Sequence, residues 1–362
     1  MTFTLGLDVG GAHLKAAWLS DGELIDVVQA PCPLWQGLDQ LEGALAEVAE
    51  LHRPLSDVAV TMTGELVDLF ADRADGVGRI LDVLAAGLPG GVPLEVFAGP
   101  AGFLPAAEAR HRVAEVASAN WHATAALAAL ALPEGILVDI GSTTTDIVPF
   151  AAGCVLNAGY TDAARMETGE LLYTGVVRTP IMAVAPQAPV KGVWRGVMAE
   201  YFATMADAHR LAGTLPEGAD LHPTADGREK GLEASARRLA RMVGADSGDP
   251  ANGGEATWRR LANHFIDHQV RRIEDGLAQV ASRGAVPDEA PLVGAGVGRF
   301  LVERVAARTG RPYRFLMEAA TLPECWRSIA ADCAPAVAVA LLNALGRAPD
   351  GTRRGRVAWA SA

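Results

Sequence analysis

Two aspartates, Asp8 and Asp139, each end an apolar segment and are followed at once by a turn of small residues. Such turns let successive backbone N–H groups approach an anion closely, and hydroxyl side chains add further donors. Carboxylates at the ends of these segments are placed to hold Mg²⁺ together with phosphate oxygens. We therefore predict two turns that bind a diphosphate from both sides, with Asp8 and Asp139 as Mg²⁺ ligands. The turn residues are Gly10, Gly11, Gly141, Ser142, Thr143 and Thr144.

The two segments repeat one pattern, because residues 5–19 and 136–150 are similar when shifted by 131 positions. In each, an apolar strand ends in Asp, a tight turn follows, and a second apolar strand begins. The repeat predicts two β-hairpins in two related subdomains that face each other. Turns of this kind also occur as plain hairpin connections. The repeated acid and the hydroxyl groups of the second turn favour phosphate binding.

Two cationic residues could add positive charge near these turns. Lys15 lies on the second strand of the first hairpin, and its direction depends on the register that the turn sets. A phosphate contact and a solvent-facing position therefore both stay open for Lys15. Arg178 lies in the polar segment 169–180 and could bind a phosphate or a carboxylate bidentately. A surface ion pair is the alternative for Arg178.

Further polar residues lie in the segment 61–68, which follows a strand and is predicted to open a helix. Glu65 and Asp68 would then lie one turn apart on one helix face. They could supply a general base or a second metal carboxylate, and the alternative is a capping box. The polar loop 220–230 either solvates the surface or closes over a site.

A third glycine-rich segment contains Gly294, Gly296 and Gly298. It follows a short apolar strand at 290–292 and precedes a predicted helix at 300–308. The spacing fits a strand-to-helix turn that faces a nucleotide or a phosphate, although such a triplet is a weak signal by itself.

The elements that must position these residues alternate between strands and helices, which predicts an α/β fold with central sheets covered by helices. Apolar runs predict buried strands at 58–62 and 94–98. Helical periodicity occurs at 38–51, 120–132, 201–211, 231–243, 258–282 and 334–345.

The composition fits a small-molecule enzyme better than a nucleic-acid or membrane protein. Half of the 362 residues are hydrophobic, and the formal net charge of −12 disfavours uniform binding to a nucleic-acid backbone. No run reaches the roughly 18 apolar residues that span a bilayer, and the N-terminus does not have the pattern of a signal peptide. The four cysteines lie far apart, which disfavours a zinc site and a disulfide framework. We expect a cytoplasmic protein with small-molecule substrates, and the sequence leaves open whether it forms a homo-oligomer.

The paired hairpins and the glycine turn resemble the superfamily of acetate and sugar kinases, actin and heat-shock chaperone ATPases. This resemblance implies two ribonuclease H-like lobes with a central cleft. It divides the chain into a first lobe at 1–133 and a second lobe at 134–362. A helical insertion is expected at about 195–285, and the C-terminal helix is a candidate to return to the first lobe.

Seven strings across nearly the whole chain resemble the methanofuran-biosynthesis synthase branch of the hydantoinase/oxoprolinase family. The resemblance implies a transferase that joins a furan-methyl diphosphate to the phenol of a γ-glutamyl-tyramine or tyrosine-derived acceptor. The products would be an aryl ether and pyrophosphate, in methanofuran or methylofuran biosynthesis for tetrahydromethanopterin-linked one-carbon metabolism. The strings are GLDVGGAHLKAA, TMTGELVDLFADRADGV, SANWHATA, LVDIGSTTTDIVP, GELLYTGVVRTP, FATMADAHRL and HPTADGREK.

This chemistry gives roles to the residues described above. The turns would bind the diphosphate together with Arg178 and the glycine triplet, and Mg²⁺ and Lys15 would stabilise the charge of the leaving group. A phenol attacks better once deprotonated, so the site needs a general base. The main alternative is an ATP-dependent small-molecule kinase of the same fold, followed by a nucleotide sensor and an amide hydrolase. The candidate bases are Glu65, Asp68 and Asp146.

Overall fold

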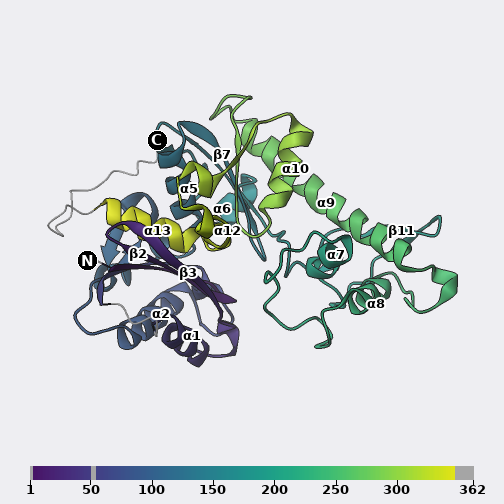
Figure 1. The fold of residues 1–362 in the computed structure, drawn as a ribbon, viewed down its shortest axis with the longest axis horizontal. Coiled ribbons are helices and arrows are strands. Elements are labelled where there is room, and N and C mark those ends of the chain that lie inside the picture. Colours follow the sequence, from purple (N-terminus) through teal and green to yellow (C-terminus); the bar gives the residue numbers. More distant parts are fainter. Residues whose placement is uncertain (1–2, 50–53, 347–362) are drawn as a thin grey trace.

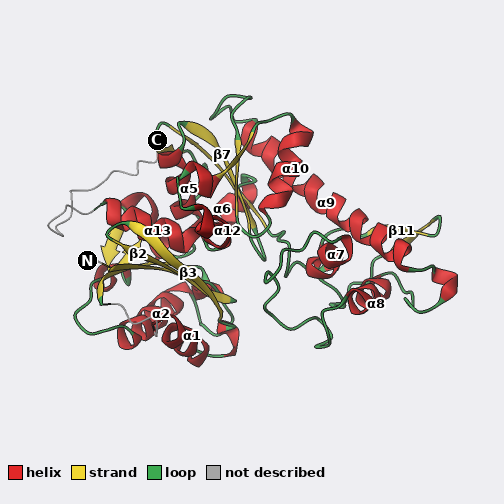
Figure 2. Cartoon of the chain, viewed as in Figure 1, coloured by secondary structure: helices red, strands yellow, loops and turns green. Residues whose placement is uncertain are grey.

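The computed structural model describes residues 3–49 and 54–346. Two α/β lobes lie side by side, and a helical arm extends from the second lobe (Figures 1 and 2). The predicted helix end at 50–51, the N-terminal residues 1–2 of the first lobe and residues 347–362 of the second lobe fall outside the described ranges.

The first lobe contains a six-stranded sheet that begins with an antiparallel meander. β1 pairs with β2 antiparallel and with β4 parallel, and β4 pairs with β5 parallel. In sheet order the strands are β3 (Glu23–Pro31), β2 (His13–Ser20), β1 (Phe3–Val9), β4 (Leu55–Met62), β5 (Leu94–Phe97) and β6 (Phe103–Pro105). The helices of this lobe are α1 (Asp39–Ala49), α2 (Arg73–Gly87), α3 (Ala106–Ala109) and α4 (Val113–Val116).

The second lobe repeats this plan. Its hairpin strands β7 and β8 are antiparallel, and β7 pairs on its other edge with β13 in parallel, as β1 does with β4. The two related subdomains predicted from the repeat, and the two ribonuclease H-like lobes that the resemblance implies, are therefore confirmed. In sheet order the strands are β10 (Leu171–Leu172), β8 (Thr145–Ala151), β7 (Glu134–Ile140), β13 (Leu292–Ala295) and β14 (Tyr313–Phe315), and β9 (Cys154–Val155) pairs with β8.

Two apolar helices, α5 (Asn120–Ala131) and α13 (Ala334–Leu345), form a shared core between the sheets. Both helices are buried around nearly their whole circumference, as expected for helices without a polar face. α13 packs on β1, β2 and β4 of the first lobe and against α5 (Figure 1). The approach is close at Gly6, where an added Cβ would lie 2.2 Å from the Ala336 carbonyl oxygen. The C-terminal helix thus lies against the first sheet.

The arm is organised by α9 (Glu255–Ala281), whose 27 residues extend over about 40 Å. Helices α7 (Met205–Ala212) and α8 (Leu232–Met242) pack on α9, and the hairpin of β11 (Gln187–Val190) and β12 (Val193–Gly196) also contacts it. The remaining helices are α6 (Asp162–Glu167), α10 (Arg299–Thr309), α11 (Leu316–Ala319) and α12 (Glu324–Asp332).

Two predicted elements differ from the structure. Segment 61–68 does not open a helix: it ends β4 and forms a single 3₁₀ turn at Gly64–Leu66. α2 begins only at Arg73, because the Asp72 side chain caps it by accepting a hydrogen bond from the Asp75 N–H. The strand predicted at 290–292 lies at 292–295, so Gly294 belongs to the strand and not to the turn.

Within the described ranges, no single helix is long and apolar enough to cross a membrane. α12 and α13 together pass on length and composition, but they are bent by 113° at their junction.

Candidate active site

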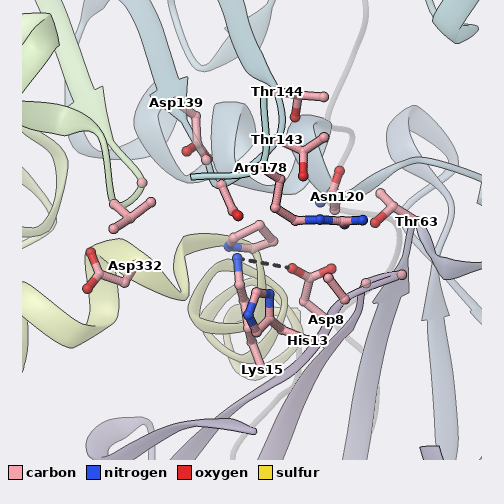
Figure 3. Close-up of a pocket in the computed structure, with 18 of the residues that line it drawn as sticks. Asp8, His13, Lys15, Thr63, Asn120, Asp139, Thr143, Thr144, Arg178 and Asp332 are labelled. Atoms are coloured by element: carbon pink, nitrogen blue, oxygen red, sulfur yellow. Dashed lines mark ion pairs between the residues drawn. The ribbon is translucent and has the colours of Figure 1, made fainter. Parts of the chain in front are cut away.

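Both predicted turns line one cavity of about 500 Å³ between the lobes. Asp8, His13 and Lys15 enter from the first hairpin, and Asp139, Thr143 and Thr144 enter from the second (Figure 3). The cavity volume lies in the range of small-molecule sites. The lining also includes Gly10, Gly11, Asn120, Gly141, Ser142, Asp146, Arg178, Gly296 and Asp332.

The first hairpin places a cation opposite its aspartate. Asp8 and Lys15 are direct cross-strand partners, with 3.8 Å between Lys15 Nζ and Asp8 Oδ2. The register, which the sequence left open, therefore places the side chains of Lys15 and Asp8 on the same face of the hairpin. Burial would lower the pKa of Lys15, but the nearby carboxylates, Asp8 above all, outweigh it and raise that pKa. The amine is therefore charged at neutral pH. Burial also raises the pKa of Asp8, against the opposing effect of Lys15.

The second hairpin places an acid opposite its aspartate. Asp139 and Asp146 are cross-strand partners at the corresponding position of the repeat. Asp146 is paired with the buried Arg165, whose guanidinium donates a hydrogen bond of 2.6 Å. Asp139 receives no hydrogen bond and no ion pair from the described residues. Burial is the main cause that raises the pKa of Asp139 to about 7, and the negative charge of Asp146 is the second.

Short backbone hydrogen bonds shape both turns. The Gly10 N–H donates to the His13 carbonyl at 3.0 Å, and the Gly141 N–H donates to the Thr144 carbonyl at 2.9 Å. The Ser142 hydroxyl is buried without a partner among the described residues, and it lines the cavity. A buried hydroxyl without a partner is costly unless a ligand satisfies it. The second turn therefore has the free donor that an anion would use.

Arg178 lies between the two turns in Figure 3. The Ser142 carbonyl accepts a hydrogen bond of 2.9 Å from the Arg178 backbone N–H, which ties the residue to the second turn. Its guanidinium stacks on the Trp35 ring at 4.9 Å and makes no ion pair with the described residues. Burial lowers its pKa, but an arginine keeps its charge at neutral pH. Arg178 is thus a cation fixed in the cavity without a counter-ion in the part of the chain that the structure describes.

The glycine triplet divides into one cavity residue and two packing residues. Gly296 lines the cavity with a φ of 78°, and an added Cβ would lie 2.4 Å from Asp139 Oδ1. At Gly294 the same atom would lie 2.7 Å from the Tyr313 ring, and at Gly298 it would lie 2.4 Å from the Ile140 side chain. Gly294 and Gly298 are absent from the lining, so the structure places only Gly296 where it could face a ligand.

The predicted acids of segment 61–68 separate in the structure. Asp68 is exposed and lies outside the cavity lining. Glu65 is buried and does not line the cavity itself. It accepts a hydrogen bond of 2.9 Å from the hydroxyl of Ser118, which does line the cavity. Asp146 reaches the cavity but is held by Arg165.

The carboxylates of Asp8 and Asp139 fit a Mg²⁺ ion whose other ligands come from the substrate and from water. Within the described ranges, Asp8 Oδ1 is buried without a hydrogen-bond partner, and no hydrogen bond contributes to the pKa of Asp139. No group of three or more His, Cys, Asp and Glu side chains within the described ranges is arranged to hold a metal. Mg²⁺ typically binds one or two carboxylates and completes its shell with phosphate oxygens and water, so two carboxylates suffice.

Several cavity residues were not selected from the sequence, among them His13, Ser118 and Asp332. His13 contacts His222 of the polar loop 220–230, with 4.5 Å between ring centroids, and burial lowers its pKa to about 3. Ser118 precedes α5 and has a φ of 53°, a rare backbone conformation for a residue other than glycine. Asp332, at the end of α12, is paired with Arg299. These residues have no repeated or spaced pattern, so only the fold brings them to the site.

Comparisons with known proteins agree on one family. The pattern of the hydantoinase/oxoprolinase family matches residues 57–334. A protein of Methanocaldococcus jannaschii is 34% identical over 243 residues, which cover 67% of this chain and 72% of that protein. A Methanococcus vannielii protein is 34% identical over 155 residues, 41% of this chain and 69% of that protein. Both are named as synthases of a furan-2-yl-methanamine that carries a γ-L-glutamylaminoethyl-phenoxymethyl group.

Among solved structures, a nucleotide-free acetone carboxylase is similar over 85% of this chain and 67% of that chain, at 12% identity and a TM-score of 0.49.

Proposed function

The chain belongs to the hydantoinase/oxoprolinase family and to its methanofuran-biosynthesis synthase branch, and we propose that it transfers a furan-methyl group from a diphosphate to a phenol. The acceptor is a γ-glutamyl-tyramine or tyrosine-derived compound, because the names of the relatives contain that glutamyl-phenoxymethyl-furan skeleton. The products are an aryl ether and pyrophosphate.

One observation carries this proposal: two small-residue turns from different lobes line the same cavity as Lys15 and Arg178. Lys15 and Arg178 both line it, and Arg178 has no ion pair with the described residues. The free Ser142 hydroxyl adds an unsatisfied donor at the second turn. A diphosphate presents several charged oxygens, so it can use donors on both sides of the cavity at once.

The same groups account for the chemistry at the leaving group. The ring oxygen of a furan stabilises positive charge on the attached methylene carbon, so the C–O bond to the diphosphate can break early. Charge then builds on the departing oxygens, and fixed N–H, hydroxyl and cationic groups stabilise it without reorganising. Asp8 and Asp139 would hold Mg²⁺, which neutralises phosphate charge when bound.

A product assay tests the proposal directly. Purified protein is incubated with the furan-methyl diphosphate, the phenolic acceptor and Mg²⁺, and the ether and pyrophosphate are both quantified. We expect equal amounts of the two products and no requirement for ATP. Absence of both products, with ADP formed when ATP and a small-molecule acceptor are supplied instead, would replace the synthase by a kinase.

A further inference from the structure

Ser118 and Glu65 form a hydrogen-bonded pair at the edge of the cavity. Ser118 lines the cavity, and its hydroxyl lies 2.9 Å from Glu65 Oε1 and 3.4 Å from Asp162 Oδ2, so Glu65 is the nearer acceptor. Glu65 is 1% exposed, and its second oxygen has no partner within the described residues. The pair therefore links a hydroxyl at the site to a carboxylate shielded from solvent.

The Ser118 backbone gives a second, independent indication. Its φ of 53° is unusual for serine, and such strained conformations concentrate at functional sites. Ser118 lies two residues before the first residue of α5, Asn120, with Ala119 as the N-cap between them.

The surroundings of Ser118 suit an aromatic ring. Trp121, Leu171 and Tyr173 line the cavity as well. The Arg165 guanidinium lies 3.9 Å from the centroid of the Trp121 ring, and the indole nitrogen of Trp121 is buried without a partner among residues 3–49 and 54–346. Aromatic walls with one free polar group are typical of sites that bind an aromatic ligand with a polar end.

The other two candidate bases are less suited to accept a proton in the cavity. Asp68 is exposed outside the lining. Arg165 donates to Asp146 at 2.6 Å and occupies one of its oxygens, and this charge opposes the rise that burial causes in the pKa of Asp146. The charged groups that act on Glu65 are Arg73 and Asp162, and these two form an ion pair of 2.6 Å with each other.

We propose that Ser118 and Glu65 form a proton relay for the acceptor phenol, which binds beside Trp121 and Tyr173. This inference rests on the proposed transfer reaction. The phenol gives its proton to Ser118 Oγ while the Ser118 proton moves to Glu65. The phenolate oxygen bonds to the furan-methyl carbon, the C–O bond to the diphosphate breaks, and the diphosphate leaves with that electron pair. Glu65 returns its proton through Ser118 to water after the products leave.

The electrostatics of Glu65 agree with this role. Burial raises its pKa, and the Ser118 hydrogen bond opposes that shift. A raised pKa of Glu65 is closer to the pKa of a phenol, which is about 10. A general base is more efficient when its pKa is closer to that of the group it deprotonates.

The test compares Ser118→Ala and Glu65→Gln with the wild type on acceptors of increasing phenol acidity, made by ring fluorination. Glutamine keeps an oxygen for the Ser118 hydrogen bond but cannot take a proton. With the parent acceptor we expect kcat to fall by about 10²–10⁴-fold in both variants and KM to change little. With the most acidic acceptor, already ionised at the assay pH, the loss should shrink by at least tenfold.

Asp82→Asn is the matched control, because Asp82 is an exposed acid on α2, which packs over the Glu65 turn. Thermal unfolding of each variant checks that it is folded. A loss of equal size for every acceptor, or no loss, would overturn the relay while the proposed reaction stands. If the wild type forms no ether with any acceptor, the proposed function fails and the relay fails with it.

Discussion

The two hairpins share one backbone plan and differ in the residue opposite the aspartate. In the first, Asp8 lies across from Lys15, and in the second, Asp139 lies across from Asp146, the position equivalent to Lys15 in the repeat. One scaffold thus carries a cation in one lobe and a second acid in the other. The repeat therefore determines where the two turns lie, while the residue opposite each aspartate, Lys15 or Asp146, determines the charge beside that turn.

This difference separates the two acids of the second hairpin as well. Asp146 is paired with Arg165, whereas Asp139 has no ion pair with any described residue, and burial raises its pKa to about 7. We interpret Asp146 as a structural acid and Asp139 as a functional one. Four predictions test this contrast.

Asp139→Asn should have the largest effect on activity. Removing the carboxylate removes a Mg²⁺ ligand, and metal stabilisation of leaving-group charge is worth several kcal/mol, so kcat should fall about 10³-fold. The measurement is pyrophosphate release as a function of Mg²⁺ concentration. An unchanged Mg²⁺ dependence in the variant would show that Asp139 does not hold the metal.

The same variant should be more stable than the wild type at pH 8 without Mg²⁺. The pKa of Asp139 is raised from 3.8 to about 7, so the folded state binds the proton more tightly than the unfolded chain does. Its ionisation therefore costs stability as pH rises from about 4 to 7, up to about 4 kcal/mol in total. Chemical unfolding at pH 8 and at pH 4 should show a gain only at the higher pH, and a loss at pH 8 would contradict the raised pKa.

Asp146→Asn should have the opposite effect on stability. It leaves the Arg165 guanidinium, whose side chain is 2% exposed, without its carboxylate. Breaking a buried pair in this way typically costs about 3 kcal/mol or more. The unfolding midpoint in urea should drop clearly, with Arg271→Gln on the exposed face of α9 as a control. A midpoint equal to that of the wild type would mean that Asp146 is not structural.

Arg178→Lys should have the smallest effect of the four. Lysine keeps the charge but loses the planar group that stacks on Trp35 and binds two oxygens at once. We expect the KM for the furan-methyl diphosphate to rise about tenfold, because one charge-assisted hydrogen bond to the diphosphate is lost. If only the KM for the phenolic acceptor rises, Arg178 belongs to the acceptor subsite.

The sequence predicts the hairpins and core helices well because their signals are local. An apolar run ending in Asp and small residues occurs twice, and α5 and α13 are apolar on every face. The predicted helix at 334–345 has the same bounds as α13. Such signals need no knowledge of the partner element.

Two predictions were wrong because residues outside the predicted segment decide its structure. Whether Gly294 and Gly298 face a ligand depends on Tyr313 and Ile140, which occupy the space beside them. Segment 61–68 has helix-type residues, but the helix begins at the Asp72 cap instead.

Two site features depend on geometry that no spacing encodes. The direction of Lys15 depends on the register of the first turn. The pairing of Ser118 with Glu65 joins residues 53 positions apart, and no spacing rule connects them.

The central claim, that both turns bind one diphosphate, is tested most directly by calorimetric titration of inorganic diphosphate with Mg²⁺. The titration uses the wild type, Lys15→Met in the first hairpin, Thr143→Val in the second turn, and the double variant. We predict one site per chain, weaker binding in each single variant, and a larger loss in the double variant. Saturable binding that responds to one hairpin alone, or no binding at all, would contradict the claim.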